Sequence, residues 1–406
     1  LFLPMLHGRA LMTVESLSRD GGLRPLQSLM AANGSSQCGF CTPGFVMSLH
    51  GRSIGACGSD LPVADVIAGN LCRCTGYGPI FAAAEAHPPC AHDDGIIVNR
   101  LKALQSEEGR EGRHGDRLWF APRTVEALST ILAAHPDARM VAGATDVGLW
   151  VTKGLRTLEK VVFLSDVEGL DSIEEGEAGL SIGATVRYAD AHGALARLHP
   201  DLGELVRRIG GLQIRNAGTI AGNIANGSPI GDGPPALIAL GATLTLCSTA
   251  GQRTMALEDY FLSYGKQDLR PDEFVEKLFI PRPQPGDIIY VAKLSKRFDS
   301  DISAVCGAFR LAVVEGCIRE PRIAFGGMAA TSRRASACEA VLNGAPFTLA
   351  TIESAAQALR QDYAPLSDLR GSSAYRIDVA ANLLRRLWHR EQGRAVSVLD
   401  VEADHG

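Results

Sequence analysis

Four of the ten cysteines stand in two tight pairs, and thiolates are ligands for metals and metal clusters. Cys38 and Cys41 form a C-x-x-C pair, and Cys72 and Cys74 form a C-x-C pair further along the chain. Soft thiolate ligands suit iron–sulfur clusters or zinc, and both pairs must come together to hold one centre. The sequence therefore predicts a metal or cluster site at these four cysteines.

The residues around the pairs place them at helix ends. Thr42 and Pro43 are typical of an N-cap and a first helical position, so a helix is expected directly after Cys41. A helical run over residues 63–68 ends at Gly69-Asn70, before the second pair, and another run begins at Pro79. Both pairs are thus predicted on loops at helix ends, where backbone N–H groups can face a negatively charged cluster.

Three chemistries compete for these cysteines. Structural zinc usually has both pairs spaced C-x₂₋₄-C, and C-x-C is unusual for it. Disulfides are a second possibility, although a chain of 406 residues can bury a core without them. A 2Fe–2S cluster is the third. Cys57 has no partner at ligand spacing and is expected in a loop over residues 51–59, and the tract 87–92 has no second ligand pair.

Composition limits the class of protein. The length predicts two or three domains, and 46% hydrophobic residues are ordinary for a globular protein. A net charge of −5 without a dense Lys/Arg run argues against non-specific nucleic-acid binding. No apolar run reaches the length of a membrane span, and no secretory signal is visible. Paired thiols without signs of secretion indicate a cytoplasmic protein that binds neither nucleic acid nor membrane.

A second constellation is rich in glycine and runs from Ile209 to Asp232. Glycines let backbone N–H groups approach a phosphate, and Thr, Asn and Ser add neutral donors. Composition alone also fits an ordinary Gly-rich turn region. A literal G-x-G-x-x-A at residues 231–236 contains Pro234 and Pro235, so it is not a Rossmann fingerprint.

The cysteine segments Q-C-G-F-C-T-P-G-F and G-N-L-C-R-C-T-G-Y resemble the helical iron–sulfur domain of molybdenum hydroxylases, the xanthine dehydrogenase and aldehyde oxidase family. The resemblance implies that Cys38, Cys41, Cys72 and Cys74 carry the 2Fe–2S cluster nearest the molybdenum cofactor. It also implies that Gln37 contacts the molybdenum pterin in a partner chain.

The segments V-A-G-A-T-D-V and I-R-N-A-G-T-I-A-G-N-I-A-N-G-S-P-I-G-D resemble the FAD-binding domain of the same family, which is related to the vanillyl-alcohol-oxidase flavoproteins. The resemblance implies that Thr219, Gly222 and Asn223 hold the phosphate and ribitol side of FAD, and that Asp232 binds toward the adenosine end. Ile209 takes a position where an aromatic often lies near the flavin; an aliphatic side chain there can pack but cannot stack. The residues implied to wrap the pyrophosphate are Val141, Ala142, Gly143, Ala144, Thr145, Asp146 and Val147.

The segment Lys293 to Ile302 resembles the family segment beside the flavin ring. Lys293 matches a lysine that contacts the flavin. Asp299 and Asp301 match acidic residues that tune the charge around the flavin and admit NAD. Without the resemblance, the same segment also fits a solvated charged turn.

The predicted fold is multidomain α+β, in five parts. Residues 1–24 would be the remnant of an N-terminal ferredoxin-like domain, since the chain opens in mid-motif and lacks the C-x₄-C-x₂-C pattern; residues 12–15 would be its last strand. Residues 25–86 would be the helical 2Fe–2S domain and 87–116 a linker, polar from Ser106 to Asp116. Residues 117–285 would be a vanillyl-alcohol-oxidase-like FAD-binding α+β domain, and 286–406 a C-terminal α+β sheet-and-helix domain.

Periodicity predicts the main elements within these parts. Helices are expected over residues 124–134, with Thr124 as N-cap, and over 348–359 and 375–388. Strands are expected over residues 139–142, 161–164, 179–184, 308–314 and 322–327.

This domain order resembles the small subunit of bacterial xanthine dehydrogenases. The resemblance implies an electron-transfer subunit of an NAD-dependent oxidoreductase. Hypoxanthine and xanthine would be oxidised at molybdenum in a large partner chain of an α2β2 heterotetramer, and electrons would pass through the 2Fe–2S cluster to FAD and on to NAD⁺. The alternative within the family is the equivalent subunit of an aldehyde oxidase or an aromatic acyl-CoA reductase. From another class, a zinc-stabilised assembly module without flavin also fits the cysteines.

Overall fold

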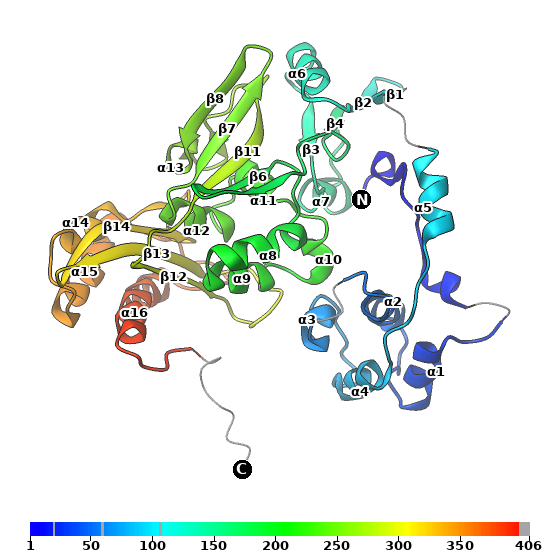
Figure 1. The fold of residues 1–406 in the computed structure, drawn as a ribbon, viewed down its shortest axis with the longest axis horizontal. Coiled ribbons are helices and arrows are strands. Elements are labelled where there is room, and N and C mark those ends of the chain that lie inside the picture. The colour runs from blue at the N-terminus through cyan, green and yellow to red at the C-terminus, as the bar shows by residue number, and fades with distance from the viewer. Residues whose placement is uncertain (19–20, 58–60, 105–107, 398–406) are drawn as a thin grey trace.

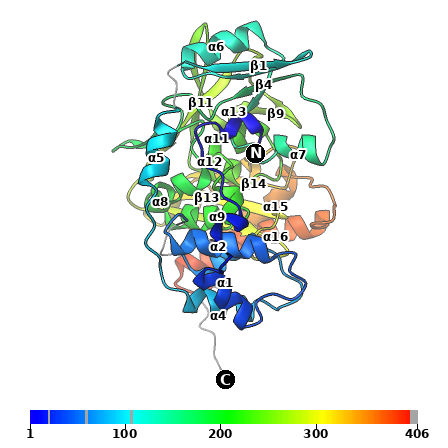
Figure 2. The same cartoon turned by 90° about the vertical axis from the view of Figure 1, so that its right-hand side faces the viewer.

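The computed structural model describes residues 1–18, 21–57, 61–104 and 108–397 of this chain. Figure 1 shows a helical region at the N-terminal end, a central α+β region and a C-terminal sheet covered by helices. Seen from the side, the helical region lies across one face of the central region (Figure 2). This arrangement confirms the predicted multidomain α+β class.

The helical region is built around a small apolar core. Its buried side chains include Phe45, Leu49, Val66 and Ile80. Pro25 starts the first helix at its first position, where the missing N–H costs nothing. The elements are the 3₁₀ turns Leu3–Leu6 and Val14–Leu17 and the helices α1 (Pro25–Ala32), α2 (Thr42–Ser53), α3 (Val63–Ile67) and α4 (Gly78–Ala86).

Two local predictions in this region are wrong. The expected strand over residues 12–15 is instead the 3₁₀ turn Val14–Leu17, because Leu17 is buried in the helical core and a strand forms only where a neighbouring strand can pair with it. Thr42 is the first residue of α2, whereas Cys41 is its N-cap, and the Thr42 hydroxyl bonds to Ser36 Oγ at 2.7 Å.

The glycine-rich stretch expected as a loop is partly helical. Helix α2 continues through Gly51 and Arg52 to Ser53, because that turn packs on the helical core through Leu49 and Ser53. Residues 54–57 form a turn, and Gly58 and Ser59 of the predicted loop lie outside the described residues.

The segment between the helical and central regions contains regular structure. Helix α5 (Gly95–Lys102) has no buried residue. Strand β1 (Arg110–His114) pairs antiparallel with β2 (Arg117–Ala121), and its side chains are mostly exposed. Strand β1 thus lies in the polar part of the predicted linker; Ser106 and Glu107 of that part are outside the described residues.

The first sheet of the central region has the strand order β1-β2-β4-β3. β4 (Lys160–Phe163) runs parallel to both β2 and β3 (Arg139–Val141). Helix α6 (Val125–Ala134) begins where the Thr124 hydroxyl accepts a hydrogen bond from the N–H of Ala127, as predicted for an N-cap. α7 (Val147–Thr152) follows the turn after β3.

The second sheet of the central region is antiparallel, with the order β5-β6-β11-β7-β8. Helix α12 is buried along its whole length and contacts both this sheet's core and the C-terminal sheet. The strands are β5 (Ile173–Glu175), β6 (Gly179–Gly183), β7 (Thr243–Ser248), β8 (Gly251–Ala256) and β11 (Phe274–Pro281), with the small pair β9 (Phe261–Ser263) and β10 (Lys266–Gln267). The helices are α8 (Tyr188–Leu198), α9 (Pro200–Arg207), α10 (Leu212–Arg215), α11 (Ile220–Asn226), α12 (Gly233–Ala239) and α13 (Leu257–Tyr260).

The C-terminal sheet is antiparallel, with the order β12-β13-β14-β15, and is covered on both faces. Side chains alternate along β13: Val305 and Phe309 pack against the C-terminal helices, whereas Cys306 and Ala308 face the core around α12. The strands are β12 (Asp287–Leu294), β13 (Val305–Val314), β14 (Cys317–Gly326) and β15 (Arg333–Arg334). The helices are α14 (Ser336–Leu342), α15 (Leu349–Asp362) and α16 (Ser373–Glu391).

The elements expected from periodicity in the central and C-terminal regions are confirmed. The G-x-G-x-x-A sequence at residues 231–236 enters α12, with prolines in the first turn, and feeds no parallel βαβ unit. Within the described ranges, every helix is too short or too polar to cross a lipid bilayer.

Candidate cofactor sites

The four predicted ligand cysteines lie together as two contacting pairs. The thiol of Cys38 interacts with that of Cys74, and the thiol of Cys41 with that of Cys72, closely enough for each pair to shift the pKa of its members. Each contact joins one cysteine of the C-x-x-C loop to one of the C-x-C loop, so the fold brings both loops together at one site. The helices α2 and α4 begin beside these loops, as predicted.

Local hydrogen bonds favour the thiolate form at one cysteine. The hydroxyl and backbone N–H of Thr75 and the backbone N–H of Cys74 lower the pKa of Cys72 to about 7. Tyr77 holds the same loop through its hydroxyl, which accepts a bond from the Cys72 N–H at 3.0 Å. The backbone at Phe40 and the thiol of Cys74 lower the pKa of Cys38, whereas burial raises that of Cys41.

Four thiol donors are the ligand set that a 2Fe–2S cluster uses. Among the described residues, no group of three or more His, Cys, Asp or Glu side chains is arranged as a metal-ion site. A 2Fe–2S cluster is held by four thiolates shared between its two irons, so its ligands stand further apart than those of one tetrahedral zinc. The two contacting pairs therefore have the chemistry that a 2Fe–2S cluster needs.

The surface around the thiols is open and carries two large exposed apolar side chains beside polar ones such as Arg73. Cys38 and Cys74 are exposed, and Gln37 is exposed next to Cys38. Phe40 is 94% exposed between the first two cysteines, and Leu71 is 68% exposed just before Cys72. Large apolar side chains so exposed beside a reactive site are typical of a surface that a protein partner covers.

The two glycine-bearing loops predicted to hold FAD lie against each other. A Cβ atom on Gly143 would stand 1.9 Å from the carbonyl oxygen of Ala217, and one on Gly218 would stand 3.4 Å from Thr145 Oγ1. Ala144, which lies between Gly143 and Thr145 in the chain, has a left-handed backbone with φ +60°. Only small residues allow this approach, so the loop over residues 141–147 and the loop before α11 form one backbone-lined cradle.

The start of α11 presents a buried polar atom without a partner. The Thr219 hydroxyl caps the helix by accepting the N–H of Gly222 at 3.0 Å. Asn223 follows in the first turn, and its buried Oδ1 has no hydrogen-bond partner within the described structure. Buried polar atoms are normally paired, so this oxygen is available to a ligand hydroxyl or N–H. The cradle and this oxygen fit a cofactor that carries phosphates and hydroxyls, such as FAD.

A buried ion pair links the central region to the C-terminal sheet. Lys293 Nζ on β12 lies 2.5 Å from Asp232 Oδ2, and Ser303 Oγ donates to the other carboxylate oxygen at 2.5 Å. Burial and the Asp232 carboxylate raise the pKa of Tyr188, whose buried hydroxyl has no partner among the described atoms. Polar groups from three separate segments therefore converge at the start of α12.

The resemblance assigned Asp232 to the adenosine end of FAD and Lys293 to the flavin ring. The structure places the charged atoms of these two residues in direct contact.

The loop between β12 and β13 is held by its neighbours. Arg208 donates to the carbonyl oxygens of Lys293 at 2.9 Å and Phe298 at 3.0 Å, and its guanidinium lies 4.4 Å from the centre of the Phe298 ring. Asp299 faces Arg207 at 3.8 Å. Backbone N–H groups of Arg297 and Ile302 bind the carboxylate of Asp301 and lower its pKa, so Asp301 closes its own turn.

Ile209 and several unpredicted residues complete the region. Ile209 is half-buried and packs against the central core. Arg215 is buried and donates to the carbonyl oxygens of Arg207 and Gly210, both at 2.8 Å. The roles of Arg208, Arg215, Tyr188 and Ser303 were not predicted, because they depend on contacts between distant segments. Only Arg215 carried a signal in the sequence, as an arginine within a glycine-rich stretch.

Three family descriptions match successive parts of this chain. They are a 2Fe-2S binding domain over residues 13–85, an FAD binding domain in molybdopterin dehydrogenase over residues 110–283, and a CO dehydrogenase flavoprotein C-terminal domain over residues 290–390. These matches confirm the predicted types of domain and their order.

Solved structures show the same fold. A chain of a Cu,Mo-CO dehydrogenase is 30% identical with a TM-score of 0.64, over 68% of this chain and 98% of that chain. A chain of the carbon monoxide dehydrogenase of Hydrogenophaga pseudoflava is 27% identical over the same shares, also with a TM-score of 0.64. Quinoline 2-oxidoreductase of Pseudomonas putida 86 is 26% identical, with a TM-score of 0.61, over 67% and 96%.

Curated relatives are much longer than this chain. The xanthine dehydrogenase of Oryza sativa is 28% identical over 88% of this chain and 32% of its own length. A nicotinate hydroxylase of Emericella nidulans is 27% identical over 95% of this chain and 37% of its own length. This chain thus spans about a third of the curated relatives that it matches.

Proposed function

This chain belongs to the molybdopterin hydroxylase family, as a part that carries 2Fe–2S- and FAD-binding domains, and we propose that it is the electron-transfer subunit of a xanthine dehydrogenase. In this proposal, hypoxanthine or xanthine is oxidised at a molybdenum cofactor in a large partner chain of an α2β2 heterotetramer. Electrons then pass through the 2Fe–2S site of this chain to FAD and on to NAD⁺. The two contacting thiol pairs carry the proposal, because they supply a four-thiolate site on a chain that also has an FAD-binding domain.

Each cofactor is assigned to residues of this chain. When bound, the 2Fe–2S cluster supplies one-electron transfer, and FAD joins single electrons to the two-electron hydride chemistry of NAD. Cys38, Cys41, Cys72 and Cys74 hold the cluster, and Thr75 stabilises the thiolate of Cys72. The loops over residues 141–147 and 217–223 hold FAD through backbone groups, Thr145, Thr219, Gly222 and Asn223.

The exposed apolar side chains around the thiols support a partner on that side. Phe40 and Leu71 stand on the two cysteine loops and are mostly exposed in this chain. Burying both would favour association by about 1.5–3 kcal/mol per side chain. We assign to Gln37, which is exposed beside Cys38, a hydrogen bond to the molybdenum pterin held by that partner.

The β12–β13 loop is the proposed flavin and NAD side. Lys293 and Asp232 hold each other in a buried pair, so they present a fixed dipole to the flavin and not a mobile charge. Arg208 holds the loop through two backbone carbonyl groups, which orients Asp299 and Asp301 at its far end. We assign the approach of NAD to this loop.

The purine substrate is supported by curated relatives named xanthine dehydrogenase. A second candidate is a hydroxylase that acts on another small molecule, since the similar solved structures are CO dehydrogenases and a quinoline oxidoreductase. In either case this chain has the same task, because the proposed site of substrate oxidation lies in the partner. This second candidate includes the equivalent subunit of an aldehyde oxidase or of an aromatic acyl-CoA reductase.

The test separates the two half-reactions. The isolated chain, loaded with FAD, is expected to oxidise NADH with an artificial dye and to leave xanthine unchanged. Adding the molybdenum-containing partner should allow xanthine to reduce NAD⁺. Xanthine turnover by the isolated chain would contradict the proposal, and so would an FAD-loaded chain that is inert toward NADH.

A further inference from the structure

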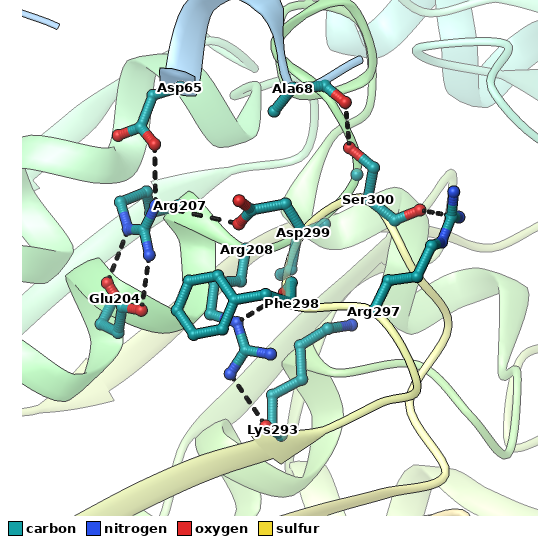
Figure 3. A network of polar contacts seen from close by, with 12 residues as sticks. Asp65, Ala68, Glu204, Arg207, Arg208, Lys293, Arg297, Phe298, Asp299 and Ser300 are labelled. Atoms are coloured by element: carbon teal, nitrogen blue, oxygen red, sulfur yellow. Dashed lines mark hydrogen bonds and ion pairs between the residues drawn. The ribbon is translucent and has the colours of Figure 1, made fainter. Parts of the chain in front are cut away.

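Besides the packing of Phe2 and Met5 against Phe163 and its neighbours in the first sheet, two groups of polar and backbone contacts join the helical region to the flavin-binding part of the chain. One group joins the turn over residues 208–213 to the segment that leads into Cys72. The other joins Arg207 and the β12–β13 loop to α3, and Figure 3 shows it at close range. Residues from the central region, the C-terminal region and the helical region thus meet at the end of α3.

Gln213 contacts both segments that carry the cysteines, here called the cysteine arms: helix α2, which follows Cys41, and the chain that leads into Cys72. Its Nε2 donates to Asn70 Oδ1 at 2.7 Å, and Asn70 precedes Cys72 by two residues. The same Nε2 lies 3.3 Å from Ser48 Oγ, and Ser48 stands on α2, the helix that Cys41 caps. Ser48 Oγ also donates to Asn70 Oδ1 at 3.1 Å. One side chain of the flavin-binding part therefore ties together the two cysteine-bearing arms.

Beside Gln213, two glycines allow the backbones to touch. A Cβ atom on Gly211 would stand 2.5 Å from the Cα of Gly69, and a Cβ on Gly69 would stand 3.2 Å from the Cα of Gly211. Gly211 has φ −84° and ψ 171°, a conformation open to any residue. Space, and not backbone conformation, therefore requires glycine at position 211.

Charged and polar groups also bind α3 and the residue that follows it, Ala68. Arg207 Nη1 donates to Asp65 Oδ1 at 2.7 Å, and Asp65 is only 8% exposed on α3. Glu204 and Asp299 lie around the same guanidinium (Figure 3). Ser300 Oγ donates to the carbonyl oxygen of Ala68 at 3.1 Å, just after α3. The β12–β13 loop is thus bonded directly to the chain that leads to Cys72.

We propose that Gln213 and the Gly69–Gly211 contact are positioning elements that fix the four-cysteine loops relative to the flavin side of the chain. The inference rests on the proposed function and adds to it the means by which the distance between the two cofactors is set. Gln213 lies between the cysteine arms and the loop that leads to Thr219, so a shift there moves the cysteines relative to the FAD cradle. Electron transfer between held groups depends on such placement.

Gly211→Ala tests this directly in the full chain. The added methyl group has no room against Gly69, whereas Gly51→Ala in α2 meets nothing within 4 Å and is the matched control. Gln213→Ala removes the hydrogen bonds without adding bulk, so it tests the proposal even if Gly211→Ala does not fold. The measurements are deuterium exchange of the backbone over residues 63–72 and the rate at which electrons equilibrate between cluster and FAD after rapid reduction.

We expect Gly211→Ala and Gln213→Ala to increase exchange over residues 63–72 and to slow electron equilibration several-fold. Iron content, FAD content and the electron paramagnetic resonance spectrum of the cluster should stay as in the unaltered chain, which a general loss of structure would not allow. Variants that match Gly51→Ala in both exchange and rate would overturn the inference. Failure of the unaltered chain to bind a cluster or FAD would instead overturn the proposed function, and this inference with it.

Discussion

Lys293 and Asp232 form a buried ion pair across two regions of the chain, with Nζ and Oδ2 2.5 Å apart and side chains only 2% and 9% exposed. Removing one partner of such a pair leaves the other charge buried and uncompensated. Ser303 binds the second carboxylate oxygen of Asp232, so the carboxylate depends on both neighbours. The ion pair joins the N-terminal end of α12 to strand β12.

The first prediction concerns this pair. Lys293→Met should lower the free energy of unfolding by about 3–5 kcal/mol, because Asp232 would lose its charged partner in the interior. Lys293→Met combined with Asp232→Asn should recover part of that loss, since no buried charge remains. Urea unfolding followed by tryptophan fluorescence measures both. A double variant that is less stable than Lys293→Met would show that the pair is not the source of the effect.

The second prediction concerns FAD retention. Asn223→Ala removes the buried oxygen that is available to a ligand and should cost about 1–3 kcal/mol of binding free energy. FAD binding would then weaken roughly tenfold to hundredfold. FAD content after gel filtration measures the loss. Asn226→Ala, an exposed position on the same helix, is the control; equal FAD content in the two variants would mean that Asn223 does not contact the cofactor.

The third prediction concerns the cluster. Cys72→Ser should remove the 2Fe–2S signal in electron paramagnetic resonance and lower the iron content, because Cys72 is the thiol that Thr75 holds ready as a thiolate. Cys57→Ser should keep both, since Cys57 packs at the edge of the helical core. Iron retained after Cys72→Ser, or lost after Cys57→Ser, would show that the ligand set is wrong.

The fourth prediction concerns acid stability. Burial, and then the charges of His92, Arg24 and His87, lower the pKa of His50, and burial lowers that of His87. The unfolded chain therefore binds more protons than the folded chain as the pH falls below the ordinary histidine value of about 6.5. The stability that neutral His50 and His87 contribute is present above that pH and is lost below it.

Urea midpoints measured between about pH 8 and pH 5 test this dependence. The midpoint should fall with the pH in this window, and His50→Gln should make the fall shallower. His114→Gln, an exposed position on β1, should leave the slope as it is. A slope that His50→Gln does not change would exclude His50 as a source of the acid sensitivity.

Sequence patterns predicted the elements that bury a periodic apolar face. The helix after Thr124 and strands β13 and β14 follow from such patterns, because side-chain burial alternates or repeats with the period of the element. The cysteine loops could be placed because helix signals flank them. The turn at Val14–Leu17 was mispredicted because β-propensity describes a fit to neighbouring strands, which local sequence does not contain.

Contacts between distant segments could not be predicted. Lys293 and Asp232 are 61 residues apart, and Gln213 and Asn70 are 143 residues apart. Nothing in the local pattern of either residue indicates its partner. These contacts hold the candidate cofactor sites together, so the residues of the sites were easier to identify than their arrangement.

The proposed electron path can be tested by an anaerobic titration of the purified chain with NADH, followed by visible absorbance and electron paramagnetic resonance. We expect the flavin absorbance to bleach and a 2Fe–2S signal then to appear, because NAD, FAD and the four cysteines are assigned to one electron path. A chain that holds FAD and the cluster but is not reduced by NADH, or one whose flavin bleaches while the cluster stays oxidised, would contradict it.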